Sequence, residues 1–167
     1  RRRKLRDRLV VGIPMAHLDA ATGLATEGFL AEHLATLLES YPARRRPLSV
    51  LHFSIRNLDA AAAKHGTANA ARLHGEVARW IQRLIRAEDT AARVGSDSFV
   101  VILPNTEESD ARSAMYRIDD VLSHTEFGLD GQPFTLWIAS GHASAQSGDT
   151  VASLLARAPA TPGSGRG

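Results

Sequence analysis

The sequence predicts an α+β fold, a sandwich in which a central, mixed but mostly antiparallel sheet is flanked by helices. Three observations predict it. Helical and strand-like segments follow one another irregularly rather than as repeated β-α units. A Gly-Ser-Asp turn joins two apolar runs in the manner of a hairpin. Hydrophobic residues make up 44% and charged residues 23% of 167 residues, which suits one globular domain with a core.

The chain divides into three parts. Leucines among charged residues predict that residues 1–16 form a linker helix from an upstream domain. Residues 17–158 form the globular domain. Residues 159–167 are rich in Pro, Gly and Ser, and we expect a disordered tail. Because the first residue is Arg and no apolar signal segment is present, we expect a fragment of a longer, cytoplasmic protein.

The first half of the domain holds three helices and one strand. Thr26 can cap the first helix, which a basic loop at 41–47 follows. The apolar run 47–55 predicts a central strand. A short Ala-rich helix is expected at 57–64, and a long amphipathic helix at 68–87 has apolar residues at the 3.6-residue period.

The second half begins with the hairpin. Residues 90–94 and 98–103 predict two short strands joined by Gly95-Ser96-Asp97. Thr106 or Asn105 can cap the next helix, whose first turn carries acidic residues.

Three further segments complete the order. Residues 127–132 predict a loop or small hairpin, residues 134–142 a strand, and residues 151–158 a last helix. We expect both tryptophans, Trp80 and Trp137, in the core, and the seven histidines on the surface or along strands.

Composition excludes several functions. The chain has no Cys, so it can form neither disulfides nor thiolate metal sites. No apolar run approaches the roughly 20 residues of a membrane helix. The net charge is only +2 and aromatic residues are few, which disfavours nucleic-acid binding. Small ligands that carry phosphate remain compatible with the clustered Arg residues.

Six short motifs, in order, connect the chain to a known family. They are Asp19-Ala20-Ala21-Thr22-Gly23-Leu24, Ser54-Ile55-Arg56-Asn57-Leu58, His65-Gly66-Thr67, Gly95-Ser96-Asp97-Ser98-Phe99, the run Val100 to Thr106, and Ala139-Ser140-Gly141. In their order and spacing they resemble the GGDEF (diguanylate cyclase) family over about residues 18–158. The resemblance implies the nucleotidyl-cyclase-like version of the predicted sandwich. The leading segment is similar to linkers that join receiver domains to GGDEF domains in response regulators.

The resemblance also implies that catalysis is lost. Joining two GTP molecules needs divalent cations, which prefer carboxylate ligands. The first metal-binding Asp of the family corresponds to Ser54, and the second Asp of that strand motif corresponds to Arg56. The hairpin corresponds to Gly95, Ser96, Asp97 and Ser98, and among these four only Asp97 is acidic. We therefore expect vestigial active-site positions, no catalytic residue, no bound metal and no Mg²⁺ requirement.

A second family site remains. Members of the family often bind cyclic di-GMP at an R-x-x-D inhibitory site before the hairpin, and Arg86 and Asp89 lie at that position. The family pattern adds Arg117 from the following helix. Arg can engage a guanine edge or a phosphate with its planar fork. The bare pattern also occurs at 56–59 and 117–120, and a surface ion pair is the alternative explanation.

We therefore expect a catalytically inactive GGDEF-like domain that acts as a cyclic di-GMP receptor through Arg86, Asp89 and Arg117. It would signal to an upstream domain or an unknown protein partner, as a homodimer or a ligand-bridged dimer. Two alternatives stay open. One is a weakly active diguanylate cyclase that uses Asp97, and the other is a ligand-free interaction or dimerisation scaffold.

Overall fold

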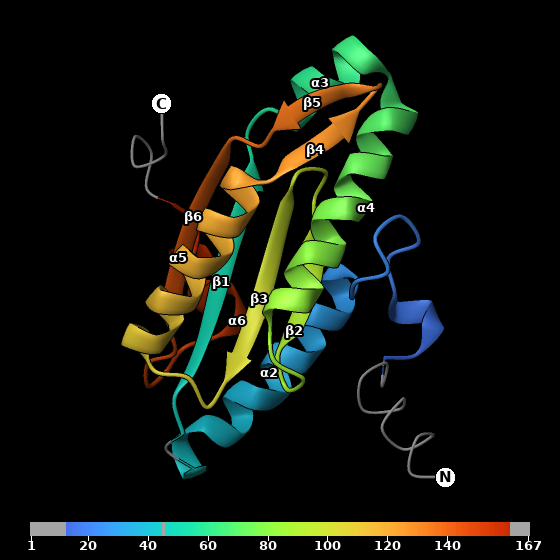
Figure 1. Ribbon diagram of the computed structural model, residues 1–167. Coiled ribbons are helices and arrows are strands. Elements are labelled where there is room, and N and C mark those ends of the chain that lie inside the picture. The colour runs from blue at the N-terminus through green and yellow to red at the C-terminus, as the bar shows by residue number, and fades with distance from the viewer. Residues whose placement is uncertain (1–12, 45, 161–167) are drawn as a thin grey trace, which may run out of the picture.

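The computed structural model describes residues 13–44 and 46–160, which form a sheet with helices on both of its faces (Figure 1). The helices are η1 (Met15–His17), α2 (Glu27–Arg44), α3 (Leu58–His65), α4 (Thr67–Leu84), α5 (Glu108–His124) and α6 (Val151–Arg157). The strands are β1 (Leu48–Ile55), β2 (Thr90–Val94), β3 (Ser98–Pro104), β4 (Glu126–Leu129), β5 (Gln132–Thr135) and β6 (Ile138–Ser144).

The main sheet has the strand order β2-β3-β1-β6, and all three of its strand pairs are antiparallel. A parallel bridge joins Ala25 to Ala92 at the β2 edge. Strands β4 and β5 form a separate two-stranded hairpin, one of the two possibilities predicted there. The predicted α+β class is confirmed, and the run that ends at Ile55 lies inside the sheet, as a central strand should.

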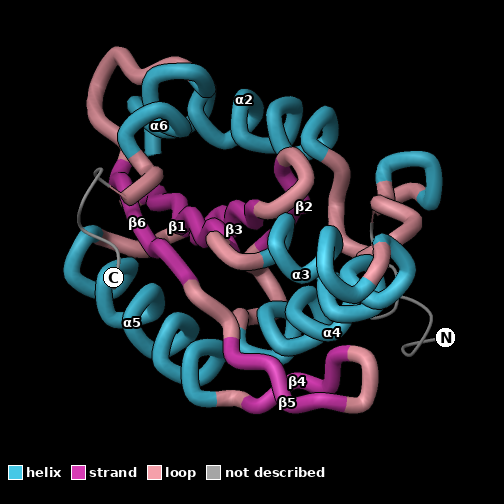
Figure 2. Tube along the Cα trace, turned by 90° about the horizontal axis from the view of Figure 1, so that it is seen from above, coloured by secondary structure: helices cyan, strands magenta, loops and turns pink. Residues whose placement is uncertain are grey.

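Two hydrophobic cores lie on opposite faces of the sheet. Leu51 and Phe53 of β1 belong to the core beneath α4 and α5, whereas Leu48 and Val50 belong to the core beneath α2 and α6. Successive side chains of a strand point to opposite faces, so one strand supplies both cores. Figure 2 shows the resulting three layers, with α2 and α6 on one side and α4 and α5 on the other.

Two helix ends differ from the prediction by several residues. Helix α2 continues to Arg44, although a loop was predicted from residue 41. Tyr41 packs against the core, and its hydroxyl donates to the carbonyl of Ala145 at 3.0 Å, which holds the helix end in place. Helix α4 ends at Leu84 rather than at residue 87, because Ile85 is extended and a turn begins at Arg86.

The predicted strand 134–142 is divided in two. Strand β5 ends at Thr135 and β6 begins at Ile138. The side chain of Asn57 replaces the missing ladder bonds, since it donates to the carbonyl of Thr135 at 3.0 Å and accepts from the N–H of Trp137 at 3.0 Å. The prediction that Trp137 lies in the core is wrong, because this residue is 48% exposed.

The structure describes only part of the predicted linker helix (1–16) and of the predicted tail (159–167). Residues 1–12 of the predicted linker helix and residues 161–167 of the predicted tail lie outside the described residues. Within the described part, Met15–His17 form a 3-10 turn. The segment after α6 lies against β6, because a Cβ at Gly141 would collide with the backbone of Ala158 to Ala160.

Candidate functional site

The hairpin that carries the predicted vestigial positions lies at one end of the sheet. Gly95 has φ +63°, a left-handed conformation that glycine adopts without strain. The carbonyl of Asp97 accepts from the N–H of Ile55 at 2.9 Å, which fixes the hairpin against the end of β1. Ser54 pairs with Ser98 in the sheet register, and exposed Arg56 follows β1 directly. The fold thus brings together all the predicted vestigial positions, from Ser54 and Arg56 to the hairpin.

This end of the sheet offers a poor set of ligands for Mg²⁺. Asp97 supplies a carboxylate, and one of its oxygens accepts from the hydroxyl of Ser98 at 3.0 Å. Ser54 and Ser98 supply neutral hydroxyls, whereas hard divalent cations prefer carboxylates. Within residues 13–44 and 46–160, no group of three or more His or acidic residues could hold a metal ion.

A partly buried polar cluster joins the entry motif to strand β2 of the hairpin, and the sequence did not indicate it. Arg93 of β2 approaches Asp19 to 3.4 Å, and Asp19 also accepts from the hydroxyl of Thr22 at 2.6 Å. Burial alone would raise the pKa of Asp19, but these hydrogen bonds and the charge of Arg93 lower it. The cluster ties the entry motif to the hairpin strand and therefore stabilises this end of the fold.

His74 of α4 belongs to the same cluster. It was predicted at the surface, but it is 2% exposed, and its ring lies edge-on to Phe99 with 4.7 Å between centroids. Burial, with the charge of Arg93 adding to it, lowers the pKa of His74 to about 4. His74 is therefore uncharged at neutral pH and serves as a core residue.

At the other end of β2, a groove of about 280 Å³ lies between the α4–β2 turn, the β3–α5 turn and α5. All three predicted ligand residues, Arg86, Asp89 and Arg117, line it. The turn itself is closed by two reciprocal bonds. The N–H of Arg86 donates to Asp89 Oδ2 at 2.8 Å, and the N–H of Asp89 donates to the carbonyl of Arg86 at 3.0 Å.

Only one of the two carboxylate oxygens of Asp89 has a hydrogen-bond partner among the described residues. Its side chain is 2% exposed, and Oδ2 lies 3.5 Å from Nε of Arg86. Oδ1 is buried and has no hydrogen-bond partner within the described residues. Burial raises the pKa of Asp89, and the hydrogen bonds and charge of Arg86 oppose that rise without cancelling it. A buried acceptor without a partner is costly, so Asp89 Oδ1 lowers the stability of the fold.

Arg117 reaches the groove from the opposite wall. It is exposed on α5, and its Nη2 donates to the carbonyl of Leu84, in the last turn of α4, at 3.0 Å. A cation at a helix C-terminus is favourable because the last carbonyls carry partial negative charge. The groove therefore has a guanidinium on each side and a carboxyl on its floor.

The structure distinguishes the three R-x-x-D sequences. Arg86 and Asp89 form an ion pair, whereas Asp120 pairs with His124 instead of Arg117. No ion pair joins Arg56 to Asp59, both of which are exposed and lie in the described part of the chain. Of these three matches, then, only 86–89 forms a closed turn beside a groove.

The predicted cap of α5 is wrong. Helix α5 begins after Glu107, without a capping side chain, and neither Asn105 nor Thr106 is its N-cap. Asn105 has φ +54° in the turn. The hydroxyl of Thr106 instead accepts from Nη2 of Arg86 at 2.6 Å and donates to the carbonyl of Pro104 at 2.9 Å. A residue predicted to start a helix therefore lines the groove instead.

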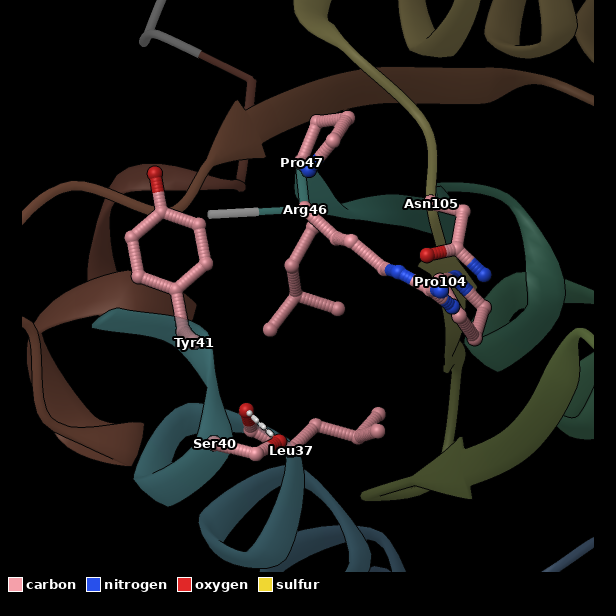
Figure 3. Close-up of a pocket in the computed structure, with 8 residues that line it drawn as sticks. Leu37, Ser40, Tyr41, Arg46, Pro47, Pro104 and Asn105 are labelled. Atoms are coloured by element: carbon pink, nitrogen blue, oxygen red, sulfur yellow. Dashed lines mark hydrogen bonds between the residues drawn. The ribbon is translucent and has the colours of Figure 1, made fainter. Parts of the chain in front are cut away.

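Two further cavities adjoin this groove. A cavity of about 110 Å³ lies between the end of α2, the start of β1 and the β3–α5 turn, and Figure 3 shows Tyr41, Arg46 and Asn105 around it. A larger one of about 810 Å³ lies between residues 13–33, α4 and the α4–β2 turn. Asn105 lines the first cavity and the groove, and Asp89 lines the second cavity and the groove.

Comparison with known proteins settles the family. The family model described as diguanylate cyclase, GGDEF domain, matches residues 16–161. The chain belongs to the GGDEF family. The resemblance seen in the sequence motifs is confirmed at the level of the family.

Individual relatives of this GGDEF domain are more distant. Diguanylate cyclase A of Treponema denticola is 32% identical over 115 residues, which are 69% of this chain and 31% of that protein. The response regulator PleD of Caulobacter vibrioides is 28% identical over 166 residues, which are 92% of this chain and 35% of that protein. The chain thus spans about a third of the length of both relatives.

The fold of the GGDEF domain is also found among solved structures. The GGDEF domain of DgcB from Caulobacter crescentus, solved in complex with c-di-GMP, matches with a TM-score of 0.81 at 19% identity, covering 87% of each chain. In the part of our chain that the structure describes, no helix is both long enough and apolar enough to cross a membrane.

Proposed function

We propose that this GGDEF domain is a cyclic di-GMP receptor that does not synthesise the nucleotide. The observation that carries the proposal is the groove in which Arg86, Asp89 and Arg117 come together around an unpartnered carboxylate oxygen. These residues are separated in sequence by up to 31 positions (117 − 86), and the fold places them on one surface. The similar DgcB domain was solved with this ligand.

The chemistry of the groove matches the ligand. An ionised Asp89 can accept from the N1–H and N2–H groups of a guanine, and its Oδ1 is unoccupied by any described residue. Arg86 can engage guanine O6 and N7 with two parallel donors, or a phosphate oxygen. Arg117 supplies a second cation for the ligand's phosphates.

The size of the groove supports a shared ligand. Pockets that enclose a drug-sized molecule measure roughly 300–1,000 Å³, and this groove is about 280 Å³ and open to solvent on one side. One domain would therefore enclose only part of a cyclic dinucleotide. Two intercalated ligand molecules would leave their remaining surfaces free to contact a second copy of the domain. We propose a ligand-bridged dimer on this basis.

The proposed loss of catalysis is inferred from the residues at the hairpin end of the sheet. Of the carboxylates that the family uses for cations, Asp97 alone remains, with Ser54 and Ser98 in the neighbouring positions. Ala62 and Ala71, at positions that hold the substrate base in active members, have no hydrogen-bonding side chain. Arg56 adds a positive charge that opposes cation binding.

Isothermal titration calorimetry with cyclic di-GMP tests the receptor proposal. The wild type should bind, and Arg86→Ala should weaken binding by roughly a hundredfold because it removes a fork of charge-assisted donors. Arg83→Ala is the matched control, since Arg83 lies in the last turn of α4, three residues before Arg86, but its guanidinium rests 5.5 Å from the centre of the Trp80 ring. Absence of binding in the wild type would end the receptor proposal.

The retained Asp97 supports one rival, a weakly active cyclase. Incubation with GTP and Mg²⁺ or Mn²⁺, followed by chromatography, should show no cyclic di-GMP above a protein-free blank. Product that disappears in Asp97→Asn would establish the cyclase instead. A domain that neither binds nor produces the dinucleotide would leave the scaffold alternative.

A further inference from the structure

Thr106 lies at the edge of the groove, and hydrogen bonds hold both its backbone and its hydroxyl in place. It is 4% exposed, its N–H donates to the carbonyl of Pro47 at 3.1 Å, and its carbonyl accepts from the hydroxyl of Ser49 at 2.7 Å. Its hydroxyl donates to the carbonyl of Pro104 at 2.9 Å. Because that proton is directed to Pro104, the lone pairs of the hydroxyl are available to a donor from the groove.

Arg86 supplies that donor. Its side chain is 54% exposed, so without a partner it would sample many rotamers. Nη2 donates to the Thr106 hydroxyl at 2.6 Å, and Nε lies 3.5 Å from Asp89 and from Glu88. A guanidinium has five N–H donors. Two of the five are used in this way, which leaves three for a ligand.

We propose that Thr106 is a positioning residue of the groove, whose hydroxyl fixes the plane of the Arg86 guanidinium so that its free donors face the ligand. The inference rests on the proposed function for the identity of the ligand, but the positioning itself concerns only residues of this chain. A planar fork recognises a base edge or a phosphate only in the correct plane, so pre-orientation raises affinity without any new contact.

The position of Thr106 explains why a hydroxyl is needed there. Thr106 follows the turn residue Asn105 and precedes α5, where a hydroxyl residue would ordinarily cap the helix. The N-cap is the next residue, Glu107, and the helix begins at Glu108, while the Thr106 hydroxyl is directed to Arg86. A valine has the same shape but cannot accept a hydrogen bond, whereas serine retains the oxygen.

The first test measures the side chain without any ligand. Rotation of the Arg86 guanidinium can be followed by ¹⁵N NMR of arginine side chains, with Arg86→Lys identifying the resonance by its disappearance. We expect hindered rotation in the wild type and in Thr106→Ser, and faster rotation in Thr106→Val. Equal rotation in wild type and Thr106→Val would overturn the proposal.

The second test measures affinity for cyclic di-GMP. Thr106→Val should weaken binding by about tenfold, and Thr106→Ser should restore it. In an Arg86→Lys background Thr106→Val should have little further effect, because the Thr106 hydroxyl acts through the guanidinium. Thr125→Val is the matched control, since it removes a hydroxyl bonded to the Val121 carbonyl, away from the groove.

The outcomes separate the two proposals. If the wild type binds and Thr106→Val binds equally well, Thr106 is not a positioning residue. Effects of Thr106→Val that are fully additive with Arg86→Lys would contradict the inference in the same way. If the wild type does not bind, the receptor proposal fails, and the NMR measurement still decides whether Thr106 holds Arg86. Urea unfolding of each variant confirms that comparisons are made between folded proteins.

Discussion

Two turns in this domain have the same local structure and different surroundings. In the turn 86–89 the N–H of Arg86 donates to Asp89 Oδ2 at 2.8 Å, and the N–H of Asp89 donates back to the Arg86 carbonyl. In the turn 146–149 the N–H of Gln146 donates to Asp149 Oδ2 at 2.7 Å, and the N–H of Asp149 donates back to the Gln146 carbonyl. Both Asp side chains are buried, with 2% and 6% exposed.

The difference lies in the second carboxylate oxygen. Asp149 Oδ1 accepts from Nη1 of Arg157 and from the hydroxyl of Ser153, both at 2.7 Å, and a further Arg157 nitrogen reaches Oδ2 at 2.8 Å. Asp89 Oδ1 has no partner among the described residues. The same turn is thus completed by the protein at 149 and left incomplete at 89.

The pKa values of the two Asp side chains shift in opposite directions. Hydrogen bonds from Arg157 and Ser153 hold the pKa of Asp149 well below its usual range, although burial acts against them. Burial raises the pKa of Asp89. A completed turn stabilises the fold, whereas a buried acceptor without a partner is costly, so we expect the turn at 146–149 to contribute more to stability than the turn at 86–89. The following predictions test that distinction, from the largest expected effect to the smallest.

Among the changes that compare the two turns, replacing Asp89 by Asn should have the largest effect on binding. The Asn amide can still accept from the Arg86 N–H, but it presents an N–H₂ group to guanine donors, so affinity for cyclic di-GMP should fall about 30-fold, or ~2 kcal/mol. Calorimetry measures this. Asp149→Asn is the matched control and should leave affinity unchanged. Equal losses of affinity in Asp89→Asn and Asp149→Asn would show that the turn at 86–89 has no special role in binding.

Replacing Arg157 by Ala should have the largest effect on stability. It removes the bidentate partner of a buried carboxylate and the donor to the Ser144 carbonyl, so the free energy of unfolding should fall by about 1–2 kcal/mol. Urea denaturation measures this. Arg112→Ala, which removes only an exposed pair with Glu108, should change stability by less than about 0.5 kcal/mol.

Replacing Arg117 by Ala should have a smaller effect on binding than Asp89→Asn. Arg117 is exposed, and among the described residues its one hydrogen-bond partner is the Leu84 carbonyl, so we expect affinity to fall about fivefold, or ~1 kcal/mol. The loss should shrink as salt concentration rises, because exposed charges are screened. Arg112→Ala, on the same helix, should leave affinity unchanged, and an equal loss there would indicate nonspecific attraction.

The pH dependence of stability should show the smallest effects, with opposite signs for the two turns. Because the folded pKa of Asp89 is raised above 3.8, the wild type should lose stability relative to Asp89→Asn as pH rises from 3.8 through that pKa. The folded pKa of Asp149 is lowered, so its contribution is complete above pH 3.8 and is lost as pH falls. Urea titrations from pH 3 to pH 7 on both Asn variants compare these slopes. Slopes of the same sign would contradict the distinction between the turns.

Most of the fold could be predicted because its signals are local. The hairpin strands begin at Thr90 and Ser98 as the apolar runs and the Gly-Ser-Asp turn indicated, and α4 follows the helical period. The relation of Arg86, Asp89 and Arg117 could be anticipated only through the resemblance to a family. The bare R-x-x-D pattern occurs three times, and composition cannot tell a turn beside a groove from a surface ion pair.

Contacts between distant segments could not be predicted. Asn57 replaces ladder bonds of Thr135 and Trp137, and Asp19 pairs with Arg93. His74, predicted at the surface, is buried against Phe99. In each case the partner is far away in the sequence, and periodicity carries no information about which polar side chain will find which partner.

By itself the sequence determined the class of the domain, the order of its elements and the presence of a single acidic residue, Asp97, in the hairpin 95–98, because these follow from residue type and local spacing. Tertiary structure alone decided that one Asp turn is closed by Arg157 and the other stays open, and that Thr106 holds Arg86 instead of capping α5. The physical reason is that a hydrogen bond depends on the position of both partners, and only the packed chain sets those positions.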